Sequence, residues 1–457
     1  MTLRRYERYK DCGVEWLGPV PAHWEVTRLK FIAHVQTGVA KGKDNTGQKT
    51  VLVPYLRVAN VQDGYLDLDE VSTIEIPADD LPRYRLRAGD VLMNEGGDFD
   101  KLGRGHVWDG SIDPCIHQNH VFAVRPFGVS PQWLNLVTGS AYAQFYFMSR
   151  SKQSTNLASI SSTNVMELPV VLPPAAEQEW IAAYLSNETA KIVTLIAEQQ
   201  VLIELLSDKR QAVIAHAVAK GLNPSALMKD SGVEWLGTVP THWRVSALGY
   251  VAAVETGATP DRANPAFWNG ETPWLKTAEI NYHPIRAAEE FITDLGLANS
   301  AAKVAPPGTL LMAMYGQGVT RGRVAVLEIA CAYNQACSAI SFGPFVNPHF
   351  ARYFFIAAYE HVRDAGNETS QMNLSAGIIR KFKLTVPPIP EQAAIVSVLD
   401  NETERIDRLL LEAEQAIALL RERRTALISA AVIGQIDVRH RARRDTALAE
   451  TAAEIGS

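Results

Sequence analysis

Two stretches of the chain, residues 175–220 and 391–433, carry apolar residues at alternating intervals of four and three and contain neither proline nor glycine. The first stripe is Ile181, Leu185, Ile192, Leu195, Leu202, Leu206 and Val213. The second is Ile395, Leu399, Ile406, Leu409, Leu420 and Leu427, with Ala413 and Ala416 between them. This spacing predicts two long coiled-coil helices. At about 1.5 Å per residue, such a helix is roughly 65 Å long.

Because the pattern occurs twice, we expect the helices to pack as an antiparallel coiled coil in a pseudo-two-fold symmetric chain. Glu188 and Glu402 interrupt the stripe at one position, and Lys209 and Arg423 interrupt it at another. A register that places Glu188 opposite Arg423 also places Glu402 opposite Lys209, so these charges could set the register. The alternative is that the long charged side chains only reach out of the seam into water.

The chain repeats itself outside the helices as well. Residues 13–38 and 232–257 both read GVEWLGxVPxHWxV at the start, and 16 of their 26 aligned positions are identical. Residues 173–218 and 387–432 both begin PPxxEQ, and 20 of these 46 positions are identical. A period of about 215 residues is too long for a solenoid and indicates a duplicated pair of domains.

Between the repeated blocks lie two dissimilar middle segments, about 40–165 and 258–380. Short β-like runs and turn signals followed by an aromatic helical stretch favour an α+β class, with two tandem domains of mixed α/β structure. The predicted order is domain 1 (1–172), a central helical spacer (173–220), domain 2 (221–386), a C-terminal helical spacer (387–438) and a disordered polar tail (439–457).

Polar side chains suited to nucleic acid gather in loops of the middle segments. Arginine and lysine fit guanine edges and phosphates, while asparagine and glutamine fit adenine. The alternative for each is a surface loop that is polar only for solubility. The candidates in the first segment are Arg57, Asn60, Lys101, Arg104, His106, Gln118 and Asn119. Those in the second are Lys276, Asn281, Gln317, Arg321, Arg323, Asn334 and Gln335.

Composition narrows the classes of protein. With 457 residues, 47% hydrophobic and 21% charged, the chain is typical of a globular protein of more than one domain. The net charge of −6 argues mildly against nucleic-acid binding, unless the basic residues gather on one face. We expect a cytoplasmic protein without a membrane span, and the four cysteines show no metal-ligand spacing.

Sequence motifs of catalysis are absent. There is no GxxxxGK[ST] loop, no HExxH and no GxSxG, and no proline pair has the flanking residues of an amino-methyltransferase. We therefore expect a non-catalytic chain with no catalytic, cofactor-binding or metal-binding residues. A fused enzyme, in which recognition and catalysis share one polypeptide, is the alternative that these absences disfavour. A purely structural coiled-coil adaptor is disfavoured because it would not need two different middle segments.

The repeated blocks resemble the specificity subunits of Type I restriction-modification enzymes. The openings GVEWLGxVPxHWxV and PPxxEQ…I…L…NET…I carry the resemblance, which extends from about Lys10 to about Val438. It implies two target-recognition domains, each reading one half of an asymmetric bipartite site in double-stranded DNA. It also implies that the helices set the spacer and dock two methyltransferase subunits, with restriction/translocase subunits beside them. S-adenosylmethionine, ATP and Mg are then expected on those partners and no cofactor on this chain.

Overall fold

The computed structural model describes residues 4–42, 46–99, 102–153, 158–315, 319–365 and 374–439. Lys101 and Gln317, two of the candidates, lie outside the described residues, as does nearly all of the tail from residue 440 on. The chain forms two compact units. The first contains residues 1–199 and 415–457, and the second contains residues 200–414, so each long helix contributes to both units.

Two main sheets form the first unit. One has four strands in the order β4 (Ala33–Thr37), β11 (Val121–Pro126), β7 (Val91–Asn94), β9 (Gly105–Val107). The other has the order β10 (Ile116–His117), β5 (Thr50–Leu56), β6 (Ser72–Pro77). Smaller sheets join β1 (Tyr9–Lys10) to β2 (Val20–Pro21), β14 (Pro169–Leu172) to β3 (Glu25–Arg28), and β12 (Lys152–Gln153) to β13 (Ala158–Ser159) and β8 (Gly96–Gly97). The helices are α1 (Leu81–Tyr84), α2 (Pro131–Thr138), α3 (Ala141–Arg150) and α4 (Ser162–Met166).

The second unit repeats this plan. Its four-stranded sheet has the order β18 (Ala252–Thr256), β25 (Cys337–Phe342), β22 (Leu310–Ala313), β23 (Val324–Val326). The other main sheet has the order β20 (Glu290–Ile292), β19 (Trp268–Leu275), β24 (Cys331–Tyr333), β21 (Val304–Ala305). The smaller pairs are β15 (Met228–Asp230) with β16 (Thr238–Pro240) and β17 (Arg244–Ala247) with β26 (Lys383–Val386). The helices are α6 (Asp294–Ala298), α7 (Pro348–Ala357), α8 (Tyr359–Asp364) and α9 (Ala376–Lys381).

The duplication therefore extends through the dissimilar middle segments. In both units the last strand of the repeated block, β4 or β18, lies at the edge of a four-stranded antiparallel sheet. Both units also contain one parallel pair, β5 with β10 and β19 with β24. Trp24 and Trp243, the second tryptophan of each block, have no exposed surface. Burial of such large apolar side chains stabilises the frame that the two sequences share.

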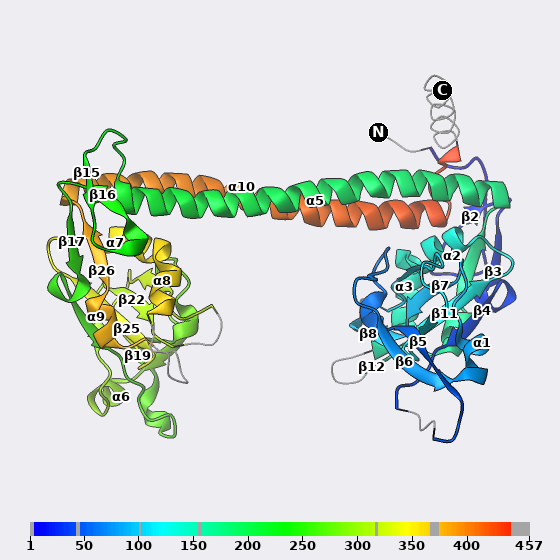
Figure 1. Ribbon diagram of the computed structural model, residues 1–457, viewed down its shortest axis with the longest axis horizontal. Coiled ribbons are helices and arrows are strands. Elements are labelled where there is room, and N and C mark those ends of the chain that lie inside the picture. The colour runs from blue at the N-terminus through cyan, green and yellow to red at the C-terminus, as the bar shows by residue number, and fades with distance from the viewer. Residues whose placement is uncertain are drawn as a thin grey trace. The chain divides into compact units, whose positions relative to one another are not determined.

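The long helices are α5 (Ala175–Lys220, 46 residues) and α10 (Ile389–Val432, 44 residues), as Figure 1 shows. In the second unit Arg210 Nε of α5 donates to Asp407 Oδ1 of α10 at 2.8 Å. Further along α5, Val218 shares a core with Leu399, which precedes Asp407. The helices therefore run antiparallel there. The predicted class, mixed helix and sheet with two long paired helices, is confirmed.

The structure brings together neither of the ion pairs expected across the helices. Among the described residues, Glu188 pairs with Lys191 and Glu402 with Arg405, each within its own helix. The Arg210–Asp407 pair places Lys209 opposite about residue 408, which is roughly 9 Å along the helix from Glu402. No described helix is long and apolar enough to cross a membrane.

The glutamate of each PPxxEQ motif ties a long helix to its unit. Glu177 accepts hydrogen bonds from Tyr6 Oη at 2.6 Å and lies 2.8 Å from His23 Nε2. In the second unit Glu391 accepts from Trp243 Nε1 at 3.0 Å and lies 2.9 Å from His242 Nε2. The repeated HW and EQ motifs therefore recognise one another, and this contact fixes the start of each long helix.

Candidate nucleic-acid interface

Three loops of the first unit meet where its parallel strands end. The amide of Gln118 donates to the carbonyl of Leu56 at 2.9 Å, which holds the loop after β10 beside the loop after β5. The amide of Glu95, which follows β7, donates to the carbonyl of His120 at 2.9 Å. The carboxyl ends of parallel strands share one edge of a sheet, and loops at such an edge commonly carry binding residues.

The same three loops meet in the second unit. The amide of Asn334 donates to the carbonyl of Leu275 at 3.0 Å, and the amide of Met314 donates to the carbonyl of Ala336 at 2.8 Å. Four candidate positions are thereby equivalent in the two units. They are Arg57 and Lys276, Arg104 and Arg323, Gln118 and Asn334, and Asn119 and Gln335. We call each set of four a loop cluster, and these are the candidate residues that the structure brings together.

The side chain of Asn60 stabilises the loop after β5 from within and does not lie on its surface. It is 3% exposed, its Oδ1 accepts from the amide of Arg57 at 2.9 Å, and its Nδ2 donates to the carbonyls of Asp67 and Glu70. A buried carboxamide with these partners would have to break them to contact a base. The expectation that Asn60 faces a ligand is not what the structure shows.

Lys276 is held by acidic neighbours. Its Nζ lies 2.9 Å from Glu290 and 3.2 Å from Glu289, and these hydrogen bonds raise the pKa of Lys276, with Glu290 the larger cause. The ammonium group therefore stays charged and is available to exchange a carboxylate for an acceptor on a guanine edge. Arg57 at the equivalent position is half-buried, and its Nε has no partner among the described residues.

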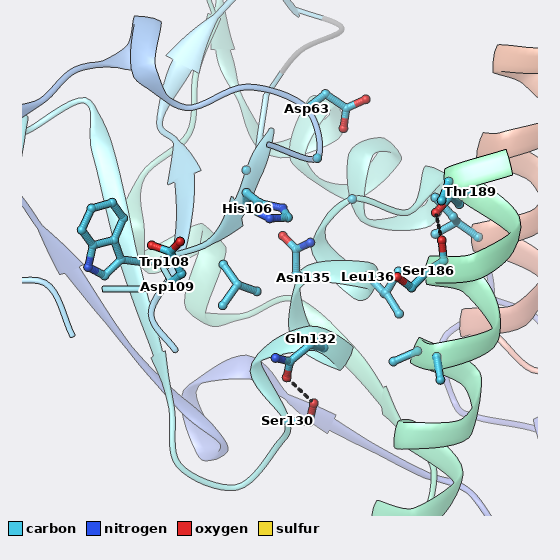
Figure 2. A pocket seen from close by; sticks show the side chains of 18 of the residues that line it. Asp63, His106, Trp108, Asp109, Ser130, Gln132, Asn135, Leu136, Ser186 and Thr189 are labelled. Carbon is cyan, nitrogen blue, oxygen red and sulfur yellow. Dashed lines mark hydrogen bonds between the residues drawn. The ribbon is translucent and has the colours of Figure 1, made fainter. Parts of the chain in front are cut away.

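His106 lies apart from the loop cluster. It lines a cleft of about 900 Å³ in the first unit, between β9, α2 and α5. Figure 2 shows His106 and Asn135 facing this space, with Ser186 and Thr189 of α5 on its other side. Burial lowers the pKa of His106, so the ring stays neutral at pH 7.

The equivalent cleft of the second unit is about 300 Å³ and is crossed by charged side chains. Tyr353 Oη donates to Asp400 at 2.6 Å, and Arg352 Nη2 lies 3.2 Å from the same carboxylate. These contacts join α7 to α10 and fill the space that stays open in the first unit. The two units therefore share strand order but differ at this junction.

The remaining candidates have varied surroundings. Arg321 is buried, with 9% of its surface exposed. Asn281 is exposed, and its Oδ1 accepts from the amide of His283 at 3.4 Å. Gln335 accepts a hydrogen bond from Thr259 Oγ1.

The sequence patterns gave no indication of Arg363. It lies on α8 beside the loop that carries Arg323, since a Cβ added at Gly322 would lie 3.4 Å from Arg363 Cγ. The equivalent residue of the first unit, counted from the helix starts Pro131 and Pro348, is Tyr146. An alignment of the two middle segments would have placed an arginine opposite an aromatic residue at this position. That difference could have indicated Arg363 from the sequence.

His117 makes the first loop cluster sensitive to acid. It is fully buried before Gln118, its Nδ1 lies 2.7 Å from the carbonyl of Val121, and burial lowers its pKa from 6.5 to about 4. The imidazole of His117 therefore binds a proton more readily in the unfolded chain than in the folded one. The contribution of neutral His117 to the free energy of unfolding is fully present above pH 6.5. It decreases as the pH falls from 6.5 to about 4, by roughly 3 kcal/mol in total. Urea unfolding of His117→Gln should show a smaller loss between pH 7 and 4.5 than the parent; equal losses would contradict this assignment.

The described residues contain no group of three or more His, Cys, Asp or Glu side chains placed to hold a metal ion. All four cysteines are free, and Cys115, Cys331 and Cys337 are buried. Burial raises the pKa of the Cys115 and Cys331 thiols to about 12. Neutral buried thiols of this kind pack as small apolar groups.

Comparison with known proteins gives the class to which this fold belongs. A solved structure described as "Structural basis underlying complex assembly and conformational transition of the type I R-M system" superposes with a TM-score of 0.72 at 17% identity, over 90% of this chain and 98% of that one. The HsdS subunit from Thermoanaerobacter tengcongensis superposes with a TM-score of 0.54 at 18% identity, over 91% and 98%. The chain therefore shares its fold with these two solved structures.

Sequence comparison gives a family match for part of the chain and several distant relatives. Residues 240–416 match the family described as Type I restriction modification DNA specificity domain. The putative type I restriction enzyme MjaX specificity subunit of Methanocaldococcus jannaschii is 26% identical over 51% of this chain and 53% of its own length. The EcoKI specificity subunit of Escherichia coli is 22% identical over 44% of each. The chain spans about half the length of the curated relatives that it matches. Both comparisons show that the chain is similar in sequence to Type I restriction-modification specificity subunits.

Proposed function

We propose that this chain is a non-catalytic DNA-recognition subunit in which each unit reads one half of an asymmetric bipartite site. The observation that carries the proposal is the pair of loop clusters. Equivalent backbone positions hold Arg57, Gln118 and Asn119 in one unit and Lys276, Asn334 and Gln335 in the other. The two units present different polar side chains from equivalent backbone positions. This difference supports the recognition of a different base sequence by each unit.

The long helices are proposed to set the spacer between the half-sites and to dock two methyltransferase subunits. Exposed apolar side chains on them support docking. In the first unit these are Val193, Leu195 and Leu419, and in the second they are Val201, Leu205 and Leu411. Apolar surface left on a soluble helix pair is typical of a protein interface. Restriction/translocase subunits would complete the assembly. S-adenosylmethionine, ATP and Mg would belong to the partners.

Selection from a random pool of duplex DNA tests the proposal. The purified chain should retain duplexes with two specified groups of bases separated by an unspecified spacer of constant length. Arg57→Ala and Lys276→Ala, at equivalent positions, are controls for each other. Each should relax the bases of one half-site only, at a cost of about 1–3 kcal/mol per lost base contact. If either variant relaxed both halves equally, separate reading by the two units would be excluded.

A further inference from the structure

Two arginines of the second unit lie over tyrosine rings beside the loop cluster. Arg323 Cζ lies 5.7 Å from the centroid of the Tyr282 ring, and Arg363 Cζ lies 5.4 Å from that of Tyr359. The two tyrosine rings meet edge to face, with centroids 6.2 Å apart and an interplanar angle of 78°. Arg323, Tyr282, Tyr359 and Arg363 thus form a continuous row, which we call the Arg–Tyr row. An aromatic face attracts a guanidinium and orients it.

The row is fastened to the candidate interface. Tyr359 Oη donates to the carbonyl of Val319 at 2.5 Å, so α8 is held against the loop between β22 and β23. Arg323 at the end of this loop is one of the four equivalent positions, and its carbonyl accepts from the amide of Ala313 at 2.9 Å. The row therefore extends the loop cluster onto α8.

The backbone of Tyr282 is held in an unfavourable conformation. Its φ is 73°, in the left-handed region, where a bulky L-residue is a genuine outlier. In the matching turn of the first unit the left-handed residue is Gly64, one position further along than the counterpart of Tyr282; its φ is 82°, which glycine adopts without penalty. Burial raises the pKa of Tyr282 to about 12, so its ring stays neutral. A tyrosine kept where glycine fits better indicates that the ring itself is used.

The first unit offers no such row in its described residues. The residue equivalent to Arg363 is Tyr146, which is 7% exposed and donates from Oη to the carbonyl of Asn164 at 3.0 Å. Asp63, at the position equivalent to Tyr282, has no ring to offer Arg104. In the first unit Arg150 Cζ lies 5.9 Å from the centroid of the Tyr146 ring, but among the described residues the continuous row of two arginines and two tyrosines occurs in the second unit only.

We propose that the Arg–Tyr row binds backbone phosphates of double-stranded DNA beside the half-site read by the second unit. This inference rests on the proposed function. A guanidinium is always charged, and one stacked on a ring is already oriented, which suits phosphate oxygens. The carboxamides of Asn334 and Gln335 are left for base edges. The opposing charge is Glu360, whose Oε2 lies 3.7 Å from Arg363 Nη1 and is 69% exposed, so a phosphate can replace this weak partner.

Salt-dependent affinity tests the proposal, because each phosphate contact releases counterions. Binding of a labelled duplex that carries the selected site is measured over a series of NaCl concentrations. For Arg363→Gln the slope of log K against log [NaCl] should become shallower by about 1. Arg408→Gln is the matched control, an arginine on α10 that is 66% exposed and paired with Glu404; its slope should equal that of the parent. Glu360→Gln should bind more tightly than the parent.

Further comparisons separate this role from others. The loss in Arg363→Gln should be the same on the selected site and on a scrambled duplex, because phosphates carry no sequence information. Tyr282→Gly should weaken binding without lowering the urea midpoint, which excludes unfolding as the cause. An unchanged slope in Arg363→Gln, or a loss confined to one base of the second half-site, would overturn the proposal. If the parent chain selected no bipartite site at all, the proposed function itself would fail.

Discussion

Replacing Gly434 with alanine is expected to destabilise the first unit by roughly 2–5 kcal/mol. Gly434 ends α10 with a φ of 73°, and its amide donates to the carbonyl of Ala431 at 3.2 Å. A Cβ at this position would lie 2.3 Å from Pro21 Cδ and 3.0 Å from Trp24 Cζ3. The variant would therefore hold alanine in the left-handed backbone region, and its Cβ would clash with Pro21 and Trp24 of the first repeated block.

Gly232→Ala is the matched control, since Gly232 has a φ of 66° but a Cβ there would meet nothing within 4 Å. It should cost only the left-handed backbone, about 1–2 kcal/mol. Urea unfolding gives the difference, and hydrogen exchange of α10 after Gln415 shows where it arises. If the two variants had the same free energy of unfolding, close packing of Gly434 against Pro21 and Trp24 would not contribute to stability.

The frame of the molecule could be predicted from its sequence because the residues that form it act locally or in repeated pairs. The four-three stripe predicts α5 and α10, and the absence of proline and glycine gives their extent. Trp24 and Trp243 recur at the same position of the repeated block, and both are buried in the structure. The contact of Glu177 with His23 joins two repeated blocks, and their joint recurrence is visible in the chain without any structure.

The surfaces could not be predicted to the same depth. Asn60 and Arg57 are three residues apart, yet one is buried under the loop and the other reaches its edge. His106 follows Arg104 by two residues on the same chain but lines the cleft near α5. Which way a loop residue turns depends on the path of the backbone and on its distant partners. The helix register likewise places Arg210 beside Asp407 and leaves the charges inside the seam, Lys209 and Glu402, apart.

Duplicating one middle segment is expected to change the sequence that the chain recognises rather than its ability to bind. The variant replaces residues 259–379 with residues 40–165, and these ranges begin and end at equivalent positions of the two units. The amide of Val39 donates to His117 at 2.8 Å and that of Ala258 donates to Tyr333 at 3.0 Å, so both segments leave the same point of the frame. The chain then returns to β14 in the first unit or to β26 in the second. Each of these strands pairs antiparallel with the strand that follows the HW motif, β3 or β17.

Selection from a random duplex pool by this variant and by the parent is the most direct test of the claim that each unit reads its own half-site. The parent should select two different half-sites. The variant should select two copies of the half-site that is relaxed by Arg57→Ala, with the spacer length of the parent retained because α5 and α10 are unchanged. Retention of the parent's second half-site by the variant would contradict the claim, because the residues assigned to read it would be gone.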